Sequence, residues 1–520
     1  MSAFSNKIII VGAAVSGALC FLPGCTTAPK PEADVESPTV AYSKLWGHEG
    51  EVWLPAGRLP DFSFAGYHCG ERVIPDYPAT TNVVAYGARG DDNVDDTAAF
   101  QAALAATESG AVIVPPGRYI ISGVLKIAKA GVVLRGSGTE QTTLYFPKPL
   151  EAPAPNAGAA TSARSMANVA GPVGFVRLEG KLGAVSVTLI TAPAARGDQS
   201  IIVGKGSQFA AGQFVEIFMT DTPDNSLAKH LYSDDAGDVS KLNGTTRGVF
   251  VTRIIKVEGN RLDLERRLRF DVRPEWRPVM RTFRPTVQDS GVEDLTFEFP
   301  VTPYGGRVTE QGFNPLVFVE VANCWARRVK CVNPDNGPLV GGAFNTVSDA
   351  VFESHRPADP QGNQGLHGIY LGGIGDHLFT RFDFRMRFMH DISVSEAAGV
   401  VVAGGKGVDL CFDQRRRAPY ETLFTDLDLG QGTRPWSSGG GDGLGKHAGA
   451  RTTFWNLRAA GPLPEPAKDF APRSANFIGV DFGRPESIDP KGLWREIDPS
   501  ADILPGDLYA AQLAHRLQAR

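Results

Sequence analysis

Residues 82–146 constrain the fold of this chain more than any other stretch. A Gly- and Asp-rich loop leads into one short amphipathic helix, expected over residues 97–104, with Asp95 and Asp96 placed to cap its amino end. After Gly110 come brief Val/Ile/Leu runs separated by turns rich in glycine and proline. These runs lie at 111–114, 119–121, 124–127, 132–134 and 142–146. Strands this short, with no helices between them, predict a solenoid whose coils stack on one another.

The same pattern returns after residue 290 and continues almost to the end of the chain. Several of these runs begin roughly 20–30 residues apart, as expected for coils with loops of varying length. They lie at 291–297, 326–332, 348–352, 377–384, 408–412, 420–429, 451–457 and 475–482. Residues 184–286 differ, because apolar and polar residues alternate there over longer runs, and they predict a small β-rich insertion. Residues 507–520 predict a short helix that caps the open end of the last coil.

The composition fits a long solenoid and argues against some classes of function. The 59 glycines and 37 prolines supply many turns, and a net charge of −5 with no basic tail argues against nucleic acid as a partner. Beyond the first 25 residues, the cysteines have neither the close pairs nor the interspersed histidines of a zinc site, so no metal ligands are assigned. They are Cys69, Cys324, Cys331 and Cys411. A disulfide between Cys324 and Cys331 and four buried thiols are both compatible with this pattern.

The first 40 residues have the features of a targeting segment. Lys7 precedes an apolar run over residues 8–22, which is too short for a comfortable membrane span and is typical of a signal peptide. The sequence Leu22-Pro23-Gly24-Cys25 resembles a bacterial lipobox, which implies lipidation of Cys25 as the mature N-terminus. Pro23 departs from the usual small residue, so ordinary secretion is the alternative. We expect an exported protein, lipid-anchored to a bacterial (outer) membrane and facing the periplasm or the cell surface.

These observations divide the chain into six parts. In order they are a lipoprotein signal peptide (1–25), a flexible tether (26–40), an N-terminal cap with the first coils (41–183), the β-rich insertion (184–286), the main coils with an active-site groove (287–482) and a C-terminal tail with a capping helix (483–520). Residues 41 to about 80 are rich in aromatics and prolines, and we expect them to pack against the first coils.

Two stretches of the chain resemble a known family. Residues 82–146, with the short helix and the Gly-rich turns, resemble the N-terminal cap and first coils of the pectate-lyase-superfamily right-handed parallel β-helix. The block PYETLFTDLDLGQGTRPWSSGGGDGLGKHAGARTTFWN resembles late coils of β-helical polysaccharide lyases and related lipoproteins. The resemblance implies an all-β, right-handed parallel β-helix and a carbohydrate-active protein. It also implies histidines near Gln414 and Arg415, where this chain has Gln-Arg-Arg-Arg instead, so the identity of a catalytic base is left open.

Residues 377–391 carry a row of basic side chains. Strand alternation directs Leu378, Phe382 and the following apolar residues to one face, and sends a polar set to the other. The polar set is His377, Arg381, Asp383, Arg385 and Arg387. Because few acids lie within this row, it predicts binding of an anionic ligand, with a solvated strand face as the alternative. His390 and Asp391 follow at the next turn, where a structural hydrogen bond is the alternative to catalysis.

Two later segments carry further candidates. Asp409 and Asp413 are expected to face outward from the strand before Arg415-Arg416-Arg417. Arginine forks grip carboxylates or sulfates in the bidentate way that a uronate or sulfated polysaccharide requires. The Gly-rich loop that follows has little reason to serve a core, and such loops commonly carry function. Its candidate side chains are Arg434, Trp436, Lys446, His447 and Arg451.

The leading hypothesis is a polysaccharide lyase that cleaves an anionic polysaccharide by β-elimination. This reaction needs a base for the C5 proton, an acid for the leaving oxygen and cations that neutralise the uronate. His447, Lys446 and His390 are candidate bases, Tyr420 is the candidate acid, and Arg415 stays a candidate because the resemblance implies basic residues in that role. Substrate contacts are expected from Arg381, Arg385, Arg416, Arg434, Trp436, Tyr370, His377 and Arg451.

Two other functions remain open. A glycoside hydrolase on the same fold would use an aspartate pair, although the available aspartates do not form the dense cluster of a polygalacturonase-like β-helix. They are Asp383, Asp391, Asp409, Asp413 and Asp442. A non-catalytic surface lipoprotein that binds glycans is the third hypothesis. No cofactor is firmly implied, and Ca²⁺ stays an option because acidic pairs are expected to face solvent, although no calcium loop is recognisable.

Overall fold

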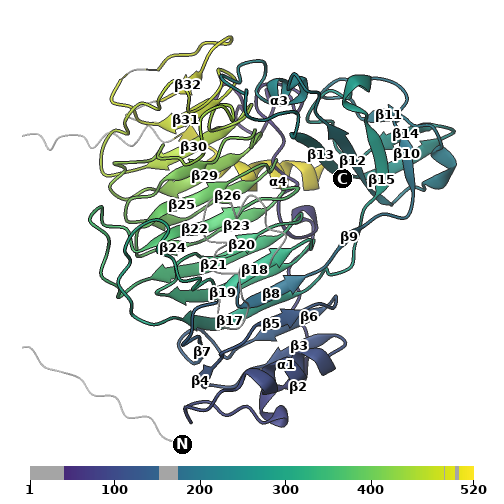
Figure 1. Ribbon diagram of the computed structural model, residues 1–520. Coiled ribbons are helices and arrows are strands. Elements are labelled where there is room, and N and C mark those ends of the chain that lie inside the picture. The colour runs from purple at the N-terminus through teal and green to yellow at the C-terminus, as the bar shows by residue number, and fades with distance from the viewer. Residues whose placement is uncertain (1–39, 151–173, 485, 498–502, 520) are drawn as a thin grey trace, which may run out of the picture. The chain divides into compact units, whose positions relative to one another are not determined.

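Two parallel sheets wind along one axis and form the body of the protein (Figure 1). The chain is seen in a computed structural model that describes residues 40–150, 174–484, 486–497 and 503–519, so Cys25 and the tether at 26–39 lie outside the described residues. The larger sheet has 16 strands: β2 (Ala79–Asn82), β3 (Gly110–Ile113), β4 (Gly117–Ile120), β6 (Val132–Arg135), β7 (Thr142–Tyr145), β17 (Gly291–Glu298), β19 (Trp325–Val332), β21 (Thr346–Glu353), β23 (Leu378–Thr380), β24 (Asp383–Phe384), β26 (Val401–Ala403), β27 (Lys406–Gly407), β29 (Leu423–Asp428), β30 (Thr453–Arg458), β31 (Asn476–Val480) and β32 (Trp494–Glu496).

The smaller parallel sheet has seven strands and carries a cluster of polar side chains at one end. They are β5 (Leu125–Ile127), β8 (Val176–Glu179), β18 (Leu316–Val319), β20 (Leu339–Val340), β22 (Gly365–Leu371), β25 (Phe388–Val394) and β28 (Phe412–Gln414). Because each coil adds one strand to each ladder, equivalent positions of successive coils become neighbours at the strand spacing of about 4.8 Å.

The core between the sheets is built from side chains that stack on their equivalents in the next coil. Phe424, Phe454 and Phe477 occupy paired positions on three successive strands, and their ring centroids lie 5.2 and 5.0 Å apart with nearly parallel planes. All three are buried. This arrangement confirms the predicted parallel β-helix.

Helix α1 (Thr97–Ala106) packs against β5 beside the first coils, as the sequence predicts. It buries Phe100, Ala103 and Leu104. Asp95 Oδ1 accepts a hydrogen bond from the backbone N–H of Thr97, whereas Asp96 Oδ1 turns back to accept from the N–H of Arg89. Asp95 is therefore the residue whose side chain satisfies a free N–H at the amino end of the helix.

The β-rich insertion is an antiparallel sheet of six strands beside the upper coils (Figure 1). Its order is β10 (Val187–Leu189), β15 (Val279–Thr282), β12 (Phe214–Thr220), β13 (Arg247–Glu258), β14 (Arg261–Leu264) and β11 (Ser200–Ile202), and the short helix α3 (Ser226–Leu231) packs on it. The paired strands β9 (Leu182–Gly183) and β16 (Arg284–Pro285) connect it to the coils. Its apolar core continues into the coils through Ala398, Ala418 and Tyr420.

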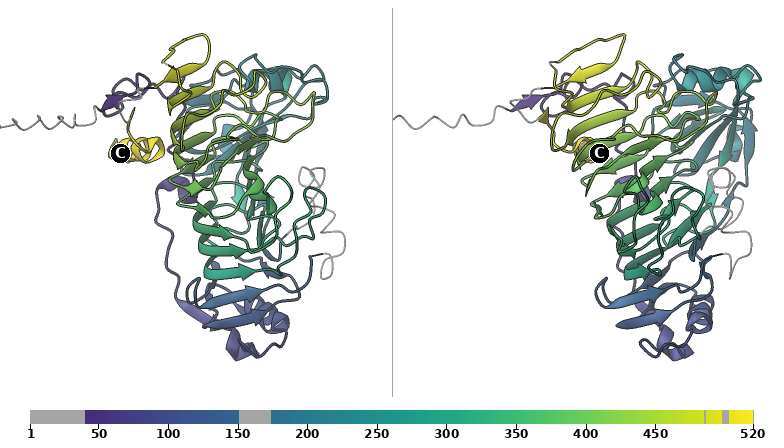
Figure 2. Two further views of the ribbon diagram at one scale, coloured as in Figure 1. Left: turned by 90° about the vertical axis from the view of Figure 1, so that its left-hand side faces the viewer. Right: turned by 60° about the vertical axis from the view of Figure 1, so that its left-hand side comes forward.

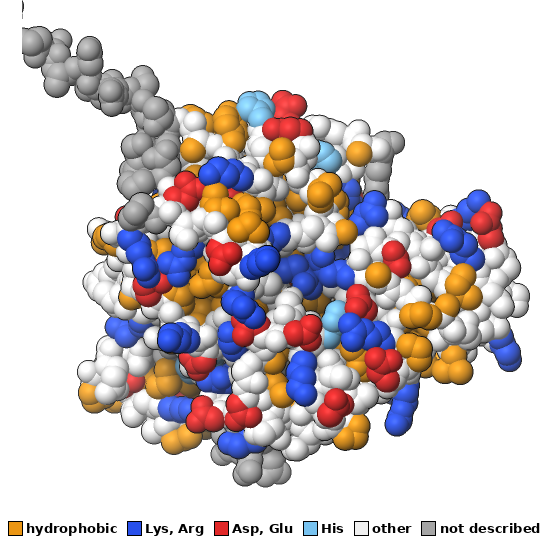
Figure 3. Space-filling view, turned by 90° about the horizontal axis from the view of Figure 1, so that it is seen from above, with side chains coloured by type: hydrophobic (Ala, Val, Ile, Leu, Met, Phe, Trp, Pro, Cys, Tyr) orange, Lys and Arg blue, Asp and Glu red, His pale blue; other side chains and the backbone are white. Residues whose placement is uncertain are grey.

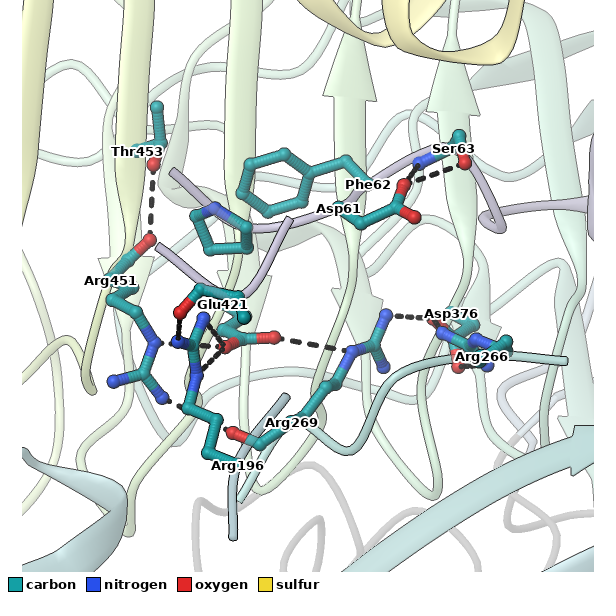
Figure 4. A network of polar contacts seen from close by, with 12 residues as sticks. Asp61, Phe62, Ser63, Arg196, Arg266, Arg269, Asp376, Glu421, Arg451 and Thr453 are labelled. Carbon is teal, nitrogen blue, oxygen red and sulfur yellow. Dashed lines mark hydrogen bonds and ion pairs between the residues drawn. The ribbon is translucent and has the colours of Figure 1, made fainter. Parts of the chain in front are cut away.

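A buried network of ion pairs ties the insertion to the coils (Figure 4). Asp376, on a turn between coils, accepts two hydrogen bonds from Arg266 at 2.9 Å and one from Arg269 at 2.5 Å. Arg269 also reaches Glu421 at 3.3 Å, and Glu421 accepts from Arg451 at 2.9 Å. These two carboxylates and the guanidiniums of Arg266 and Arg269 are at most 6% exposed, so each depends on its partners for charge compensation.

The N-terminal strap, residues 41–82, runs along the outside of the larger sheet (Figure 2). It begins beside the last coils, where β1 (Ala41–Tyr42) pairs with β33 (Ile503–Leu504) and Trp46 and Phe62 pack with Trp455. It ends at the first coil, where β2 pairs with β3. The expectation that residues 41–80 pack against the first coils is therefore wrong for most of the segment. The aromatic residues of the strap instead cover an apolar face of the late coils.

Helix α4 (Leu508–Gln518) lies against the strap and strand β29. The Tyr509 hydroxyl donates to the Ala65 carbonyl at 2.9 Å, Gln512 Nε2 donates to the Pro60 carbonyl at 2.9 Å, and the Leu508 N–H donates to Thr425 Oγ1 at 3.0 Å. The last strand of the larger sheet is β32, so this helix does not cap the end of the solenoid as the sequence suggested. It clamps the strap instead.

The cysteines and helices settle two further points. Cys69, Cys324, Cys331 and Cys411 are free and buried, so the alternative of four buried thiols is the correct one. None of the described helices is long and apolar enough to cross a membrane.

Removing the Asp376 carboxylate should destabilise the fold strongly. Asp376→Asn leaves two buried guanidiniums short of a counter-charge, and we expect it to lower the free energy of unfolding by about 3–5 kcal/mol. The matched control is Asp349→Asn, which removes an equally bidentate partner of Arg381 at a pair whose side chains are 36% and 62% exposed. That change should cost about 1 kcal/mol or less. Equal losses in urea unfolding would contradict a dominant role for the buried network.

Candidate active site

The strands β22, β25 and β28 bring a polar cluster together at one end of the seven-stranded sheet. In the strand register, His367 pairs with His390, and Ser393 pairs with Asp413. Arg415 follows β28 directly. We call these five residues the His-Asp-Arg cluster.

A chain of hydrogen bonds connects Arg415 to Asp413 through His367 and Ser393. Arg415 Nη1 lies 3.4 Å from His367 Nε2, and because a guanidinium only donates, Nε2 must accept. The proton of His367 is therefore on Nδ1, which donates to Ser393 Oγ at 2.7 Å, and Ser393 donates to Asp413 Oδ2 at 2.7 Å. Burial, followed by the charge of Arg415, lowers the pKa of His367 well below its ordinary value, which keeps the ring neutral.

Asp413 is fully buried and is the anchor of the cluster. Burial alone would raise its pKa, but His390 and Arg415 outweigh burial and hold the pKa well below the usual range. Arg415 Nη1 donates to Asp413 Oδ2 at 2.9 Å, and the backbone N–H of Gly439 donates to Oδ1 at 2.6 Å. Asp413 is therefore a fixed negative charge that orients its neighbours.

His390 is the member of the cluster best suited to act as a base. Its ring stacks on His367 with centroids 5.1 Å apart, and its Nδ1 lies 3.6 Å from Asp413 Oδ2, buried and without a hydrogen-bond partner. The nearby carboxylate favours the proton on Nδ1, which leaves the lone pair on Nε2. Burial, opposed by Asp413 and assisted by Arg415 and Arg307, lowers the pKa of His390. A neutral imidazole at physiological pH is the result.

The Gly-rich loop lies over this cluster. A Cβ on Gly439 would stand 3.1 Å from Arg415 Nη1 and 3.4 Å from His390 Cε1, so a side chain at this position would crowd both groups. The insertion holds the next turn of the loop through three backbone hydrogen bonds, from Lys241 to Gly443 at 2.8 Å, from Gly445 to Asp238 at 2.7 Å and from Lys446 to Ala236 at 2.8 Å.

Lys446 helps to hold the loop in place and contacts none of the five residues of the His-Asp-Arg cluster through its ammonium group. Its ammonium group pairs with Asp235 at 2.8 Å and donates to the Ala471 carbonyl at 3.3 Å. The structure therefore gives Lys446 a structural role in place of the catalytic role that the sequence suggested.

His447 lies beside the cluster in a separate group with Arg416 and Asp469. Its Nδ1 lies 3.1 Å from the Gln414 carbonyl, and its Nε2 lies 3.0 Å from Arg416 Nη2. Since the guanidinium donates, Nε2 accepts, and Nδ1 carries the proton that it donates to Gln414. Burial and then Arg416 lower the pKa of His447. With both nitrogens engaged, His447 is a weaker candidate base than His390.

Arg416 is itself committed to neighbours within the protein. It donates to Asp469 Oδ2 at 2.9 Å and to the carbonyl of Gly445, and its side chain is 10% exposed. This arginine therefore positions the loop, and Arg415 is the one of the pair that reaches the cluster.

His377 does not face solvent as strand alternation suggested. It is fully buried at a turn, where its Nε2 lies 2.9 Å from the Gly372 carbonyl. Burial lowers its pKa to about 4. The segment 377–391 is three separate strands with turns between them, so a single alternation does not run through it.

The basic row is also neutralised by acids from neighbouring coils. Arg381 makes a bidentate pair with Asp349 at 2.7 and 2.8 Å, and Arg385 pairs with Asp383 and Glu353 at 2.9 and 3.4 Å. Figure 3 shows basic and acidic side chains intermingled on the face seen from above. The premise that few acids oppose this row is wrong, because the opposing carboxylates belong to other coils and are distant in sequence.

Four other candidates have structural roles. Arg434 is 10% exposed and donates to Asp391 at 2.6 Å, and Arg451 belongs to the buried network around Glu421. Trp436 packs among core phenylalanines, with its ring 5.0 Å from that of Phe454. Tyr420 is 3% exposed in the core of the insertion, where burial raises the pKa of its phenol, so it cannot reach a substrate as the acid.

His367, Ser393 and Arg307 are not among the site residues predicted from the sequence. His367 and His390, and His390 and Asp413, are each 23 residues apart, and this coil-length spacing is the signal that could have grouped them. Arg307 is exposed on the loop between β17 and β18 and lowers the pKa of both His367 and His390 by its charge. No spacing in the sequence connects it to the cluster.

The aspartates that were expected to face outward are buried instead. Asp409 and Asp413 are at most 4% exposed, and each pairs with an arginine, Asp409 with Arg434 at 3.4 Å and Asp413 with Arg415 at 2.9 Å. The premise for a calcium site, an acidic pair open to solvent, is therefore wrong at these two positions. Across the described residues, no group of three or more His, Cys, Asp or Glu side chains is arranged to hold a metal ion.

Comparison with known proteins gives a family match at the first coils. Residues 80–151 match the family described as rhamnogalacturonase A/epimerase, pectate lyase-like. This region holds α1 and the strands β2 to β7, the same stretch whose pattern predicts the solenoid. No curated protein matches the chain.

Solved structures show a similar winding of the chain at low identity. The tailspike gp61 of Pseudomonas phage phi297 is 11% identical, with a TM-score of 0.32 over 80% of this chain and 83% of that one. The gp54 tailspike of Acinetobacter baumannii bacteriophage AP22, solved with A. baumannii capsular saccharide, is 12% identical, with a TM-score of 0.33 over 83% and 76%. An exopolygalacturonase from Thermotoga maritima is 10% identical, with a TM-score of 0.30 over 82% and 77%.

These scores are too low to carry an argument about the site. The stacked parallel coils show a β-helix fold over the described chain, and residues 80–151 match the family of pectate lyase-like rhamnogalacturonases and epimerases.

Proposed function

We propose that the protein is an enzyme that cleaves an anionic polysaccharide by β-elimination at the His-Asp-Arg cluster. The observation that carries the proposal is the imidazole of His390, whose pKa is lowered by burial, with its Nδ1 3.6 Å from the fixed carboxylate of Asp413, which also binds the guanidinium of Arg415. The family match at residues 80–151 agrees with a carbohydrate substrate.

Each chemical requirement of the reaction has a candidate group in or beside the cluster. His390 Nε2 takes the proton from C5 of a uronate, the electron pair forms the C4–C5 double bond, and the bond from C4 to the glycosidic oxygen breaks. Arg415 and Arg307 neutralise the uronate carboxylate and stabilise the negative charge that develops on it. When H5 and the leaving oxygen lie on one face of the sugar, the imidazolium of His390 returns its proton to that oxygen, so no separate acid such as Tyr420 is needed.

Hydrolysis is less well supported by the same residues. A hydrolase of the two-carboxylate type needs one carboxyl group that is protonated at the working pH. Asp413 accepts hydrogen bonds from Ser393, Arg415 and Gly439, and its pKa lies well below the usual range, so it cannot serve as that acid. Asp469 also has a lowered pKa, because Arg416 and His447 outweigh the effect of burial.

We also propose export and a lipid anchor at Cys25, from the lipobox-like sequence alone. A lipid-anchored enzyme that faces a cell surface would meet polysaccharide outside the cytoplasm.

Loss of the His390 imidazole should abolish turnover without unfolding the chain. His390→Gln removes the base, and we expect kcat/KM to fall by about 10²–10⁴-fold. The measurement is the ultraviolet absorbance of the unsaturated product over a panel of anionic polysaccharides. The control is His48→Gln, which makes the same change at a side chain 61% exposed on the strap. Reducing ends without the ultraviolet band would identify a hydrolase, and full activity of His390→Gln would remove His390 from the mechanism.

The pH profile should follow the neutral form of His390. Because burial lowers the pKa of His390, the base form persists below the ordinary imidazole value of about 6.5. Activity is then lost only as the pH falls through this lower pKa, so the acid limb of kcat/KM should have its midpoint below 6.5. Asp413→Asn removes the charge that raises the pKa and should move the midpoint to still lower pH. A shift to higher pH in this variant would contradict the assigned pair.

The lipid anchor predicts a specific modification. Cells that express the chain and are labelled with palmitate should incorporate label into the wild type, and Cys25→Ser should abolish it. Cys20→Ser, within the same apolar run, is the matched control and should keep the label. Label in the Cys25→Ser chain, or none in the wild type, would contradict anchoring at Cys25.

A further inference from the structure

A small cavity of about 20 Å³ lies where the strap, the insertion and the coils meet. Asp61 of the strap, Arg196, Arg266 and Arg269 of the insertion, and Glu421 of a coil all contribute to its lining. A water molecule needs roughly 10–15 Å³ of such volume, so the cavity holds one particle of about that size. A single-atom ion fits this space, whereas a polyatomic anion such as sulfate is too large.

The charges around the cavity do not balance (Figure 4). Among the described residues, the guanidiniums that are buried or nearly buried in this network are those of Arg196, Arg266, Arg269 and Arg451. The carboxylates in and beside it are those of Asp61, Asp376 and Glu421. One positive charge is therefore left without a counter-charge.

Glu421 already serves three guanidiniums. Its Oε1 accepts hydrogen bonds from Arg451 at 2.9 Å and from Arg196 at 3.2 Å. Its Oε2 lies 3.3 Å from Arg269. The guanidiniums of Arg196 and Arg451 thus share one carboxylate oxygen, and no oxygen of Glu421 is free to compensate a further charge.

Asp61 does not bond to any of these guanidiniums in the part of the chain that the structure describes. Its Oδ1 accepts from the backbone N–H of Ser63 at 3.0 Å and from the Ser63 hydroxyl at 2.6 Å. In Figure 4 its carboxylate lies apart from the row of arginines. Asp61 therefore contributes negative charge to the cavity without closing the network.

Other nearby charges are paired or in contact with solvent. Asp271 accepts from the backbone N–H of Arg196 at 2.9 Å, but its carboxylate pairs with Arg273 at 2.8 Å. Arg267 also lines the cavity, yet its side chain is exposed and donates to the Gly197 carbonyl at 3.0 Å. Burial, assisted by the charge of Arg451 and opposed by Glu421, lowers the pKa of the Arg196 guanidinium, as expected where positive charge is in excess.

Hydrogen-bond donors remain available in the lining. Arg266 binds Asp376 and the Val251 carbonyl through Nη1 and Nη2, and its Nε has no partner among the described residues. Arg269 uses Nε and Nη2, and its Nη1 likewise has no partner there. Both side chains are at most 6% exposed. A buried charge without compensation is costly, and a small anion that accepts from these N–H groups would remove the cost.

We propose that this cavity is a chloride site, in which one ion completes the charge balance between the strap, the insertion and the coils. Chloride has the single negative charge that the network lacks and the single-atom size that the cavity accepts. Because all three parts contribute to the lining, the bound ion stabilises the contact of the strap with the insertion. The site is independent of the reaction proposed above for the His-Asp-Arg cluster.

Chloride should stabilise the full chain more than ionic strength alone explains. The apparent Tm is measured in mixtures of sodium chloride and sodium gluconate at constant ionic strength, since gluconate is too large for the cavity. We expect chloride to raise Tm by about 1–2 °C, on a curve that levels off by about 0.15 M. The same Tm in both salts would overturn the proposal.

Removal of a carboxylate should strengthen binding, an effect that misfolding cannot imitate. Asp61→Asn keeps an oxygen for Ser63 and removes negative charge beside the cavity, so the chloride concentration at the midpoint of the Tm curve should fall about fivefold. Glu49→Gln is the matched control, because it makes the same charge change on the strap at a side chain that is 84% exposed, and it should leave the midpoint unchanged. Equal shifts in the two variants would contradict a site at the cavity.

Removal of a guanidinium should abolish the chloride dependence. Arg196→Met takes away the excess positive charge and keeps an unbranched apolar side chain of similar reach. It also loses the bonds to Glu421 and lowers Tm for that reason, so the measurement is the difference in Tm between the two salts for a variant that is folded by circular dichroism. A difference as large as that of the wild type would overturn the proposal, and where the variant does not fold, Asp61→Asn decides.

Bromide distinguishes an ion from a water molecule. Crystals grown in sodium bromide and measured at the bromine absorption edge should show an anomalous peak inside the cavity, in contact with Arg266 or Arg269. A water molecule in that place, or an empty cavity at a saturating bromide concentration, would overturn the chloride site whether or not the protein cleaves a polysaccharide. A peak there supports the site even where β-elimination is wrong.

Discussion

The hydrogen-bonded register between successive coils is the constraint on which the rest of this structure depends. It sets equivalent positions of neighbouring coils at the strand spacing of about 4.8 Å. The same register therefore stacks the inward-facing side chains in the core and the outward-facing side chains on the surface. Inside, it aligns Phe424, Phe454 and Phe477 as a column of rings. Outside, it aligns Val317, Leu339, Tyr370, Ser393 and Asp413, and a chemical gradient from apolar to charged results along one row.

The insertion gains its importance from what it holds in place. A sheet that only decorated the coils would have no need of buried carboxylates, yet Asp376 and Glu421 bind it through arginines that water hardly reaches. The same insertion grips the turn at Gly443 and Gly445, and through it the loop whose Gly439 N–H fixes Asp413. The orientation of the cluster is therefore linked to the packing of residues that lie far earlier in the chain.

Much of the fold could be predicted from the sequence, because short apolar runs and Gly-rich turns are local signals. The roles of the candidate site residues are harder to predict, because they depend on partners from other coils. The partner of Arg381 is Asp349, which lies 32 residues earlier on a neighbouring coil, and Trp436 packs against Phe454, so neither role can be recognised from the local sequence. His390 and Arg415 were among the candidates, whereas His367 and Ser393 needed the register to be recognised. The strap could not be predicted, because its aromatics have no periodicity and match a surface made by distant coils.

The strap has a consequence for how the molecule responds to damage. In a simple solenoid each coil touches only its neighbours, so an end can fray without disturbing the other. Here one segment pairs with β33 at the late coils and with β3 at the first, and α4 fastens it midway. Loss of order at the last coil would release the strap, and the Trp325 surface that Tyr67 and Tyr77 cover near the first coils would become exposed. Proteolysis at one end would thereby destabilise the other end, so the strap couples the stability of the first and last coils.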